Sequence, residues 1–369
     1  MYRLVHVSQH NECHEAENRY YARHAKNRYI QVLKGSTHHM SPRKATARAN
    51  PNIALIKYWG NQDDDLRLPA NGSISINLAG LETVTTVEFN KDIDEDRLTL
   101  NGEPQTIEQT RRVSQHLDHI RRLAGVNLHA HIISENNFPT GTGIASSASG
   151  FAALSLAACN ALDVHLEEAG LSALARLGSG SACRSVPGGY VEWHVGVDHH
   201  TSYATSIVPA AHWDLIDLVA IVSRKHKAIS STNGHQLANT SPLQNARVAD
   251  TPRRLEQCRR AILQKDFDPL AAIIEEDALM MHAVLMTSHP TVLYWLPATV
   301  RIMQAVLNWR ANGIPAAFTI DAGPNVHVIS TAAQQERLLR LLNELDGVQD
   351  VLLATIGGPA QVIDAHVTA

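Results

Sequence analysis

The chain carries one glycine- and serine-rich segment at 137–150, which reads Asn137-Phe138-Pro139-Thr140-Gly141-Thr142-Gly143-Ile144-Ala145-Ser146-Ser147-Ala148-Ser149-Gly150. Gly141 and Gly143 allow backbone dihedrals that other residues resist, so several amides can turn toward one centre. The helix predicted after them offers unpaired N–H groups and the positive end of its dipole, and the serine hydroxyls add further donors. This segment therefore predicts a loop that leads into a helix and binds an anion, and a triphosphate fits it best.

Two other phosphate-binding loops do not match this segment. The pattern GxxxxGK[ST] is absent, and residues 141–146 only approach GxGxxG. A dinucleotide-binding turn also needs an acidic residue at the end of a second strand, whereas Asp163 lies between two predicted helices. A glycine- and serine-rich helix start selected only for tight packing stays open at this point.

Composition excludes several classes of partner. The chain has 369 residues, and its 32 Lys plus Arg against 36 Asp plus Glu give a formal net charge of −4. Without a broad basic field, neither nucleic acid nor an anionic membrane is expected to bind. The most apolar stretch, 144–162, contains several serines, so a buried helix explains it better than a membrane span.

Cysteine usage and the N-terminus indicate the compartment. The four cysteines form no CxxC pair and no extracellular framework, which favours a reducing, cytoplasmic location; they are Cys13, Cys159, Cys183 and Cys258. No secretory signal peptide is expected, because the N-terminus lacks an apolar core.

The length favours two domains, since single domains average about 150 residues. The sequence pattern predicts a first lobe at 40–212 and a second lobe at 213–369. Residues 1–39 are rich in His, Asn, Arg and Tyr and lack apolar periodicity, so we expect an N-terminal extension that is irregular or disordered. A metal site on one helix face is the second option for this extension, with ligands from His6, His10, Cys13 and His14.

Apolar periodicity predicts a mixed α+β protein without internal repeats. An apolar stretch at 52–59 and alternation at 73–78 indicate a β-rich opening, and strands are predicted at 82–89, 128–134, 188–195, 215–222, 316–319, 326–329 and 351–355. Helices are predicted at 106–124, 150–162, 166–177, 251–263, 270–286, 299–312 and 333–345.

Three further motifs accompany the 137–150 segment. They are Asn52-Ile53-Ala54-Leu55-Ile56-Lys57-Tyr58-Trp59-Gly60, Gly178-Ser179-Gly180-Ser181-Ala182-Cys183-Arg184-Ser185 and Asp321-Ala322-Gly323-Pro324-Asn325. In this order the four motifs resemble the mevalonate diphosphate decarboxylase family. The similarity covers nearly everything after residue 44, and it extends through Leu68-Pro69-Ala70-Asn71-Gly72-Ser73-Ile74-Ser75, Leu100-Asn101-Gly102-Glu103-Pro104 and Ser230-Ser231-Thr232.

The resemblance implies both a fold and a reaction. The family belongs to the GHMP kinase superfamily, in which a ribosomal-protein-like N-terminal lobe and a ferredoxin-like C-terminal lobe enclose the active site. ATP, with Mg²⁺, would phosphorylate the tertiary 3-hydroxyl of a phosphorylated mevalonate. Phosphate and carbon dioxide would then leave to form an isopentenyl alkene, since phosphate is a far better leaving group than hydroxide.

Three residues are the predicted catalytic groups. Asp321 matches the family's catalytic aspartate, which would orient or deprotonate the 3-hydroxyl; taken alone, it could equally be a turn residue before Gly323-Pro324. The planar guanidinium of Arg184 can form two parallel hydrogen bonds to the substrate carboxylate. The alternative is that Arg184 forms an ordinary salt bridge at the protein surface. Lys57 lies in an apolar stretch, where a buried ammonium needs an anion such as a phosphate or Asp321.

Nucleotide and substrate contacts also follow from the resemblance. Tyr58 and Trp59 are expected to shape the pocket wall or the core, and Ser179 and Ser181 to contact substrate. Ser146 and Ser147 suit the γ-phosphate and Mg²⁺. The full set of predicted ATP contacts is Pro139, Gly141, Thr142, Gly143, Ala145, Ser146 and Ser147.

One position departs from the family pattern. The relatives that use the diphosphate have a lysine directly after KYWG, where this chain has Asn61. Losing a positive charge at the substrate's phosphate end weakens binding of a diphosphate more than of a monophosphate, because the diphosphate carries more charge. We therefore hypothesise mevalonate 5-phosphate as the substrate and isopentenyl phosphate as the product, with mevalonate 5-diphosphate as the alternative. Arg111 or Arg112 is expected to supply the remaining cationic contact.

Two other functions stay open on the sequence alone. A kinase of the same superfamily would phosphorylate the 3-hydroxyl and stop, although Arg184 argues against it. A non-catalytic ligand sensor on this fold would have no need to keep Asp321, Lys57 and the serine loop together. Family resemblance alone suggests a homodimer.

Overall fold

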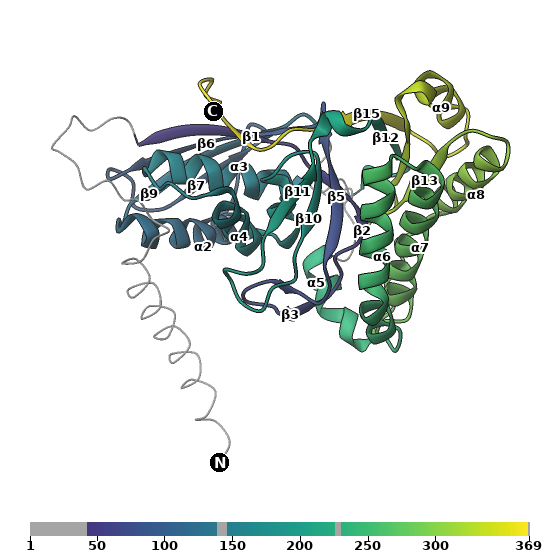
Figure 1. The fold of residues 1–369 in the computed structure, drawn as a ribbon. Coiled ribbons are helices and arrows are strands. Elements are labelled where there is room, and N and C mark those ends of the chain that lie inside the picture. Colours follow the sequence, from purple (N-terminus) through teal and green to yellow (C-terminus); the bar gives the residue numbers. More distant parts are fainter. Residues whose placement is uncertain (1–42, 139–145, 226–229, 368–369) are drawn as a thin grey trace, which may run out of the picture.

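The structure is a computed structural model, and it describes residues 43–138, 146–225 and 230–367. The predicted extension at 1–39 lies outside these residues. Within them, two sheets are covered by separate groups of helices (Figure 1). No described helix is both long and apolar enough to cross a membrane.

The first sheet has six strands in the order β16–β1–β6–β9–β7–β8. These strands are β1 (Lys44–Ala49), β6 (Thr83–Asn90), β7 (Arg97–Leu100), β8 (Glu103–Pro104), β9 (His129–Asn136) and β16 (Gln361–Ile363). Helices α2 (Ile107–Ala124), α3 (Ser146–Ala161) and α4 (Glu168–Gly178) pack together on its lower face (Figure 1). Phe151 and Leu154 of α3 share a core with Val87 and Phe89 of β6. Burying each such side chain stabilises the fold by about 1.5–3 kcal/mol.

The second sheet has eight strands and joins both predicted lobes. Its order is β11–β10–β5–β15–β12–β14–β13, with β2 also paired to β5. The strands are β2 (Asn52–Ile56), β5 (Ser73–Ala79), β10 (Tyr190–Trp193), β11 (Ala204–Val208), β12 (Leu215–Ile221), β13 (Ala316–Thr319), β14 (Val326–Thr331) and β15 (Asp350–Ile356). Because β15 pairs with both β5 and β12, strands from both halves of the chain belong to one hydrogen-bonded sheet.

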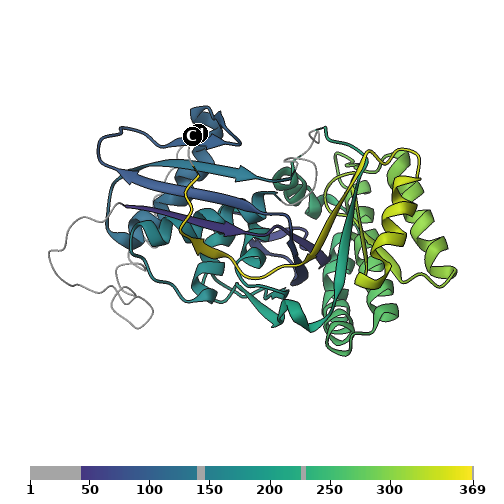
Figure 2. The same cartoon turned by 90° about the horizontal axis from the view of Figure 1, so that it is seen from above.

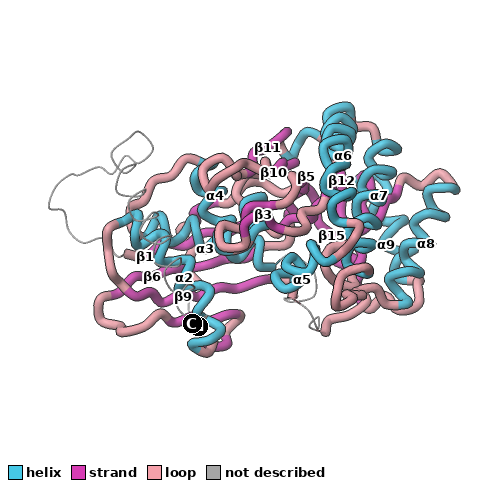
Figure 3. The backbone as a smooth tube through the Cα atoms, turned by 90° about the horizontal axis from the view of Figure 1, so that it is seen from below, coloured by secondary structure: helices cyan, strands magenta, loops and turns pink. Residues whose placement is uncertain are grey.

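The C-terminal part of the chain returns to the first sheet. After β15, the segment drawn in yellow crosses over, and β16 pairs with β1 (Figure 2). A small hairpin of β3 (Asn61–Asp63) and β4 (Leu68–Pro69) follows β2. The remaining helices are α5 (Ser231–Leu237), α6 (Gln244–Gln264), α7 (Phe267–Met286), α8 (Pro297–Ala311) and α9 (Gln335–Asn343). Seen from below, α5 lies in the middle of the molecule, between α3 and α7 (Figure 3).

Helices α6 and α7 hold the end of β2 through buried charges. Asp277 of α7 accepts a hydrogen bond from the Lys57 backbone N–H at 2.6 Å and pairs with Arg254 of α6 at 3.0 Å. Arg247 of α6 donates to the Lys57 carbonyl at 2.7 Å. Asp277 and Arg254 are both 0% exposed. The backbone of Lys57 is therefore held on both sides by ionic groups from the second half of the chain.

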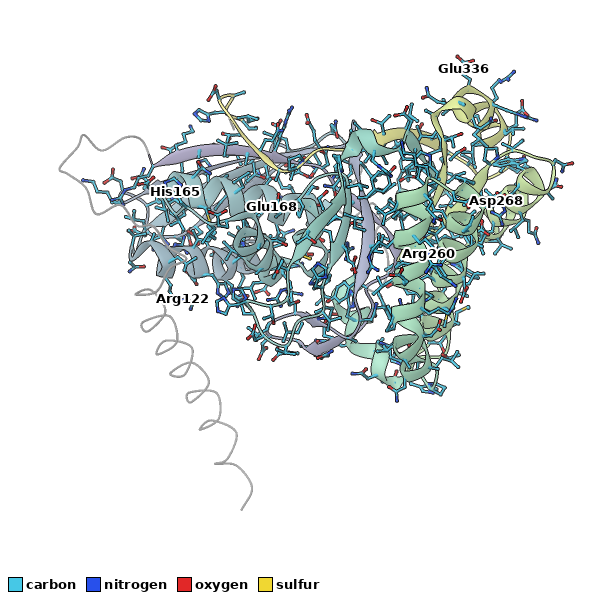
Figure 4. All side chains as sticks on the ribbon, in the orientation of Figure 1. Arg122, His165, Glu168, Arg260, Asp268 and Glu336 are labelled. Atoms are coloured by element: carbon cyan, nitrogen blue, oxygen red, sulfur yellow. The ribbon has the colours of Figure 1, made fainter. Side chains whose placement is uncertain are left out.

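We expect Asp277→Ala to lower the free energy of unfolding by about 3–5 kcal/mol, because buried Arg247 loses its carboxylate partner and buried Arg254 keeps only Asp250, at 3.6 Å. Denaturant unfolding monitored by circular dichroism measures this change. Asp268→Ala is the matched control: Asp268 is exposed near the start of the same helix (Figure 4) and should cost at most about 1 kcal/mol. Equal effects of the two substitutions would contradict this account of the Asp277 network.

Candidate active site

A cavity of about 270 Å³ lies between the two groups of helices. The chain before residue 213 lines it with Ala54, Lys57, Tyr58, Trp59, Arg67, Arg112, Ser146, Ser147, Ser179, Gly180, Ser181 and Arg184. The later part of the chain lines it with Ser230, Ser231, Thr232, His235, Met281, Asp321 and Ala322. Most of the residues predicted from the sequence to contact substrate thus meet around one space.

Lys57 reaches this cavity because β2 is irregular at its end. Residues 52–56 are buried, and the pairing of β2 with β5 shifts register between Ala54 and Ile56. Such bulges redirect the side chains that follow them. The Lys57 ammonium then donates to the Ala54 carbonyl at 2.7 Å and to the Asp321 carboxylate at 2.5 Å.

Asp321 lies in the turn between β13 and β14, where its own carbonyl accepts a hydrogen bond from the Gly323 N–H at 2.7 Å. Its carboxylate pairs with Lys57, which is 1% exposed at the side chain, while 25% of the Asp321 side chain stays exposed toward the cavity. Burial alone would raise the pKa of Asp321, but Lys57, His327 and Arg184 outweigh it and hold this pKa below its usual value. Burial lowers the pKa of Lys57, and Asp321 offsets part of that effect. The pair places an ionised carboxylate at the cavity wall.

Arg184 lies in a short 3-10 helix, Gly180–Ser185, and is 3% exposed. Its guanidinium donates to the Ser73 hydroxyl at 2.7 Å and to the Asn52 side-chain oxygen at 3.1 Å. Among the described residues, Arg184 forms no ion pair with a carboxylate. The uncharged side chains of Ser73 and Asn52 fix the orientation of its guanidinium. The guanidinium is therefore positioned to receive an anion from the cavity.

Tyr58 and Asn61 form a polar corner at the edge of the site: Tyr58 lines the cavity, whereas Asn61, predicted to contact substrate, does not line it. The Tyr58 hydroxyl donates to the Asn61 side-chain oxygen, and the Asn61 amide donates to Asp64 at 2.7 Å. The His235 ring stacks on Tyr58 with centroids 4.1 Å apart, and its Nδ1 accepts the Gly60 N–H at 3.0 Å. At the position where the family pattern has a lysine, this chain therefore has an uncharged Asn61, whose amide is bonded to the Asp64 carboxylate.

Ser146 and Ser147 open helix α3 and line two cavities. The second cavity, of about 230 Å³, has mostly apolar walls from Leu98, Leu100, Val113, Ile132, Phe151 and Leu154. The Ser147 and Ser179 hydroxyls lie 3.2 Å apart, which links the start of α3 to the segment that carries Ser181. The other predicted ATP contacts, Pro139, Gly141, Thr142, Gly143 and Ala145, lie outside the described residues.

The two adjacent arginines of α2 have different surroundings. Arg112 lines the cavity and donates to the Gly178 carbonyl at 2.7 Å. Arg111 is exposed, pairs with Glu108 at 2.7 Å and does not line the cavity.

Sequence reasoning missed Met281 of α7 and two polar or charged lining residues, Arg67 and His235. Arg67 directly precedes the recognised Leu68-Pro69 segment, and His235 follows the Ser230-Ser231-Thr232 segment. Neither has a spacing signal of its own; only proximity to a recognised motif could have indicated them.

The fold and the cavity define a two-lobed α+β enzyme of the GHMP kinase superfamily. Two family models match the chain: the diphosphomevalonate decarboxylase-like N-terminal domain at residues 49–204 and the mevalonate 5-diphosphate decarboxylase C-terminal domain at residues 217–361. The chain therefore belongs to the mevalonate diphosphate decarboxylase family, whose members are ATP-dependent decarboxylases.

Individual relatives match over most of their length. The diphosphomevalonate decarboxylase of Candida albicans is 38% identical over 316 residues, covering 81% of this chain and 87% of that protein. The human diphosphomevalonate decarboxylase is 37% identical over 308 residues, covering 77% and 76%.

Solved structures agree with the sequence matches. The Staphylococcus aureus mevalonate diphosphate decarboxylase superposes with a TM-score of 0.83 at 38% identity, covering 88% of this chain and all of that chain. A structure described as MDDEF in complex with MVAPP, AMPPCP and magnesium gives a TM-score of 0.82 at 38% identity, covering 87% and 99%. The family and the fold class predicted from the sequence are confirmed, whereas the lobe boundary at 212–213 and the roles of the individual site residues stay predictions.

The Lys57–Asp321 pair should make stability depend on pH. Because the folded pKa of Asp321 is depressed, its contribution is fully present above the unfolded value of about 3.9 and is lost as pH falls through the folded value. We expect Asp321→Asn to lower the free energy of unfolding by about 2 kcal/mol at pH 7, with a smaller difference below pH ~4. Urea unfolding of both proteins across this range measures it. A difference that does not change with pH would contradict the ion pair.

Proposed function

We propose that this protein uses ATP to decarboxylate a 5-phosphorylated mevalonate, with mevalonate 5-diphosphate as the first candidate. The observation that carries the proposal is the Lys57–Asp321 pair beside Arg184 in one cavity. The names of the relatives favour the diphosphate, since the Candida and human proteins are diphosphomevalonate decarboxylases. The hypothesis that mevalonate 5-phosphate is preferred has no support from these relatives.

Asp321 would act on the 3-hydroxyl of the substrate. Its ionised carboxylate can accept the hydroxyl hydrogen bond and direct the oxygen toward the γ-phosphoryl group. The Lys57 ammonium keeps this carboxylate in place and adds positive charge where negative charge gathers during phosphoryl transfer. Asp321 would thus orient the hydroxyl and could accept its proton as the phosphoryl group is transferred.

Arg184 would hold the carboxylate of the substrate. A guanidinium forms two parallel hydrogen bonds to a carboxylate, and Asn52 and Ser73 fix its orientation. When the 3-phosphate leaves, the bond from carbon 2 to the carboxylate supplies the electron pair of the new double bond, and carbon dioxide is released. A kinase that stopped after phosphorylation would have no use for this contact.

ATP would enter from the side of α3. The start of this helix and the hydroxyls of Ser146 and Ser147 suit the polyphosphate, and the apolar second cavity beside them suits the base. The relative bound to AMPPCP and magnesium supports this assignment. Mg²⁺ would neutralise polyphosphate charge, with a serine hydroxyl and phosphate oxygens as ligands, because the described residues include no group of three His, Cys, Asp or Glu side chains placed for a metal.

Mevalonate 5-phosphate is the second candidate substrate, and the polar corner favours it. Asn61 carries no charge, and its amide is bonded to the carboxylate of Asp64. This arrangement leaves less positive charge for a second phosphoryl group than a lysine would.

We also propose a cytoplasmic location and leave the homodimer as a proposal from family resemblance. Cys159, Cys183 and Cys258 are all free and buried, which suits a reducing compartment.

Parallel assays with Mg-ATP test the reaction and its substrate. We expect carbon dioxide release from mevalonate 5-diphosphate to have the higher kcat/KM. A higher kcat/KM with mevalonate 5-phosphate would transfer the assignment to the second candidate. ADP formation without carbon dioxide from either compound would identify a kinase instead.

Asp321→Ala separates catalysis from binding. We expect turnover to fall by roughly 10³-fold or more, since an orienting group of the reacting hydroxyl is lost. Nucleotide affinity, measured with a fluorescent ATP analogue, should change less than about threefold. Retention of normal turnover would argue for a ligand sensor or another catalytic residue.

A further inference from the structure

The second sheet contains a buried pair of ionisable side chains on neighbouring strands. His327 of β14 and Asp217 of β12 are 2% and 0% exposed at the side chain, and the His327 Nδ1 lies 2.6 Å from the Asp217 Oδ2. His327 stands opposite Val219, which lies two residues after Asp217 and therefore on the same face of β12. Val219 belongs to the core that α6 and α7 cover. The pair thus lies between the sheet and these two helices.

Asp217 depends on His327 for a counter-charge. Within 43–138, 146–225 and 230–367, Asp217 has no ion pair other than the one with His327. A carboxylate in the interior is costly unless a cation accompanies it, so a protonated His327 ring stabilises Asp217 better than a neutral ring does. In the same part of the chain, the His327 Nε2 has no hydrogen-bond partner. The positive charge of the ring is therefore not taken up by a further hydrogen bond.

A short series of contacts connects this pair to Asp321. His327 stands opposite Thr319 of β13, and Thr319 lies two residues before Asp321. The Thr319 hydroxyl donates to the Ala54 carbonyl at 3.3 Å, and the same carbonyl accepts a hydrogen bond from the Lys57 ammonium. Burial raises the pKa of Asp321, whereas Lys57 and, after it, His327 lower this pKa. The charge of His327 is thus close enough to act on the Asp321 carboxylate.

A second buried histidine beside Asp321 lacks such a charge. The Nε2 of His282, on α7, lies 3.3 Å from the Ile320 carbonyl, so this nitrogen carries the proton and donates it. Burial lowers the pKa of His282 to about 4, which leaves the ring neutral at pH 7. His282 therefore contributes packing and a hydrogen bond next to Asp321 without a positive charge.

We propose that His327, held as an imidazolium by Asp217, is a positioning residue that keeps the Asp321 carboxylate ionised and oriented toward the 3-hydroxyl. This role rests on the proposed function. Lys57 holds the carboxylate by direct contact, whereas His327 does not line the cavity and acts from within the sheet. An ion pair that only joins β12 to β14 is the alternative.

Several charged or titratable groups face this region, and a pH profile depends on all of them. Those around Asp321 are Lys57 after β2, Arg184 of the 3-10 helix, His282 of α7 and His327 of β14, while Asp277 of α7 faces Lys57 and Asp217 of β12 faces His327. A test must therefore change the charge of His327 and leave the others in place.

His327→Gln makes this change, because the amide can still donate to Asp217 but carries no charge. We expect the acid limb of the kcat/KM profile to move to higher pH by roughly one unit, since Asp321 then takes up a proton more readily. Asp217→Asn should give a similar shift, because an uncharged partner no longer favours the imidazolium. His282→Gln is the matched control: altered packing can lower kcat, but the acid limb should stay in place.

Urea unfolding at pH 7 tests the same coupling without the reaction. We expect Asp321→Asn to change the unfolding equilibrium constant by roughly tenfold less in the His327→Gln background than in the unmutated protein, because one pKa unit corresponds to a factor of ten. In the His282→Gln background its effect should be unchanged. If His327→Gln does not fold, Asp217→Asn serves for both measurements.

Either of two results would overturn the proposal: an acid limb that does not move, or additive effects of the two substitutions on unfolding. If neither variant folds, ¹⁵N NMR of the histidine-labelled unmutated protein decides, with a His327 imidazolium expected at pH 7 and a neutral ring contradicting it. Absence of carbon dioxide release by the unmutated protein would refute the proposed function, whereas the unfolding cycle still decides whether His327 and Asp321 are coupled.

Discussion

The buried ammonium of Lys57 is the constraint around which the site is organised. An isolated charge in the interior is costly, so it requires both a counter-charge and a fixed position. Asp321 supplies the counter-charge from the β13–β14 turn, and the β2 bulge with Asp277 and Arg247 fixes the backbone. Residues from both ends of the chain must therefore fold together before this pair can form.

The charged residues of the site form two groups: an ion pair within the protein, and three arginines without a carboxylate partner among the described residues. Lys57 is neutralised within the protein, which keeps the Asp321 carboxylate ionised and oriented. Arg184, Arg67 and Arg112 are held by carbonyl, amide and hydroxyl groups, so their charge is directed at a ligand. A substrate with a carboxylate and a phosphoryl group, together with ATP, supplies several anions for these cations. This division explains why the cavity combines an ion pair with three guanidiniums.

Motifs predicted the reacting groups well because each lies in a short segment with a distinctive composition. Lys57 in an apolar strand and Asp321 before Gly323-Pro324 could be found in the sequence, and their 2.5 Å contact agrees with the anionic partner predicted for Lys57. The sequence could not separate Arg111 from Arg112, since neighbours on a helix point about 100° apart and the phase depends on packing.

Other features depended on long-range packing that local patterns do not contain. A helix was predicted to begin at 251, beside Pro252, yet α6 begins at Gln244, because Arg247 and Arg254 on either side of this proline are buried against Asp277. The pairing of β16 with β1 joins residues more than 300 positions apart and has no local signature.

A crystal structure with a non-hydrolysable ATP analogue, Mg²⁺ and the phosphorylated mevalonate would show whether the Lys57–Asp321 pair acts on the 3-hydroxyl. We expect the 3-hydroxyl oxygen within about 3 Å of the Asp321 carboxylate, with the Lys57–Asp321 pair intact. A 3-hydroxyl directed away from Asp321, with this ion pair broken, would show that Asp321 does not act on the hydroxyl.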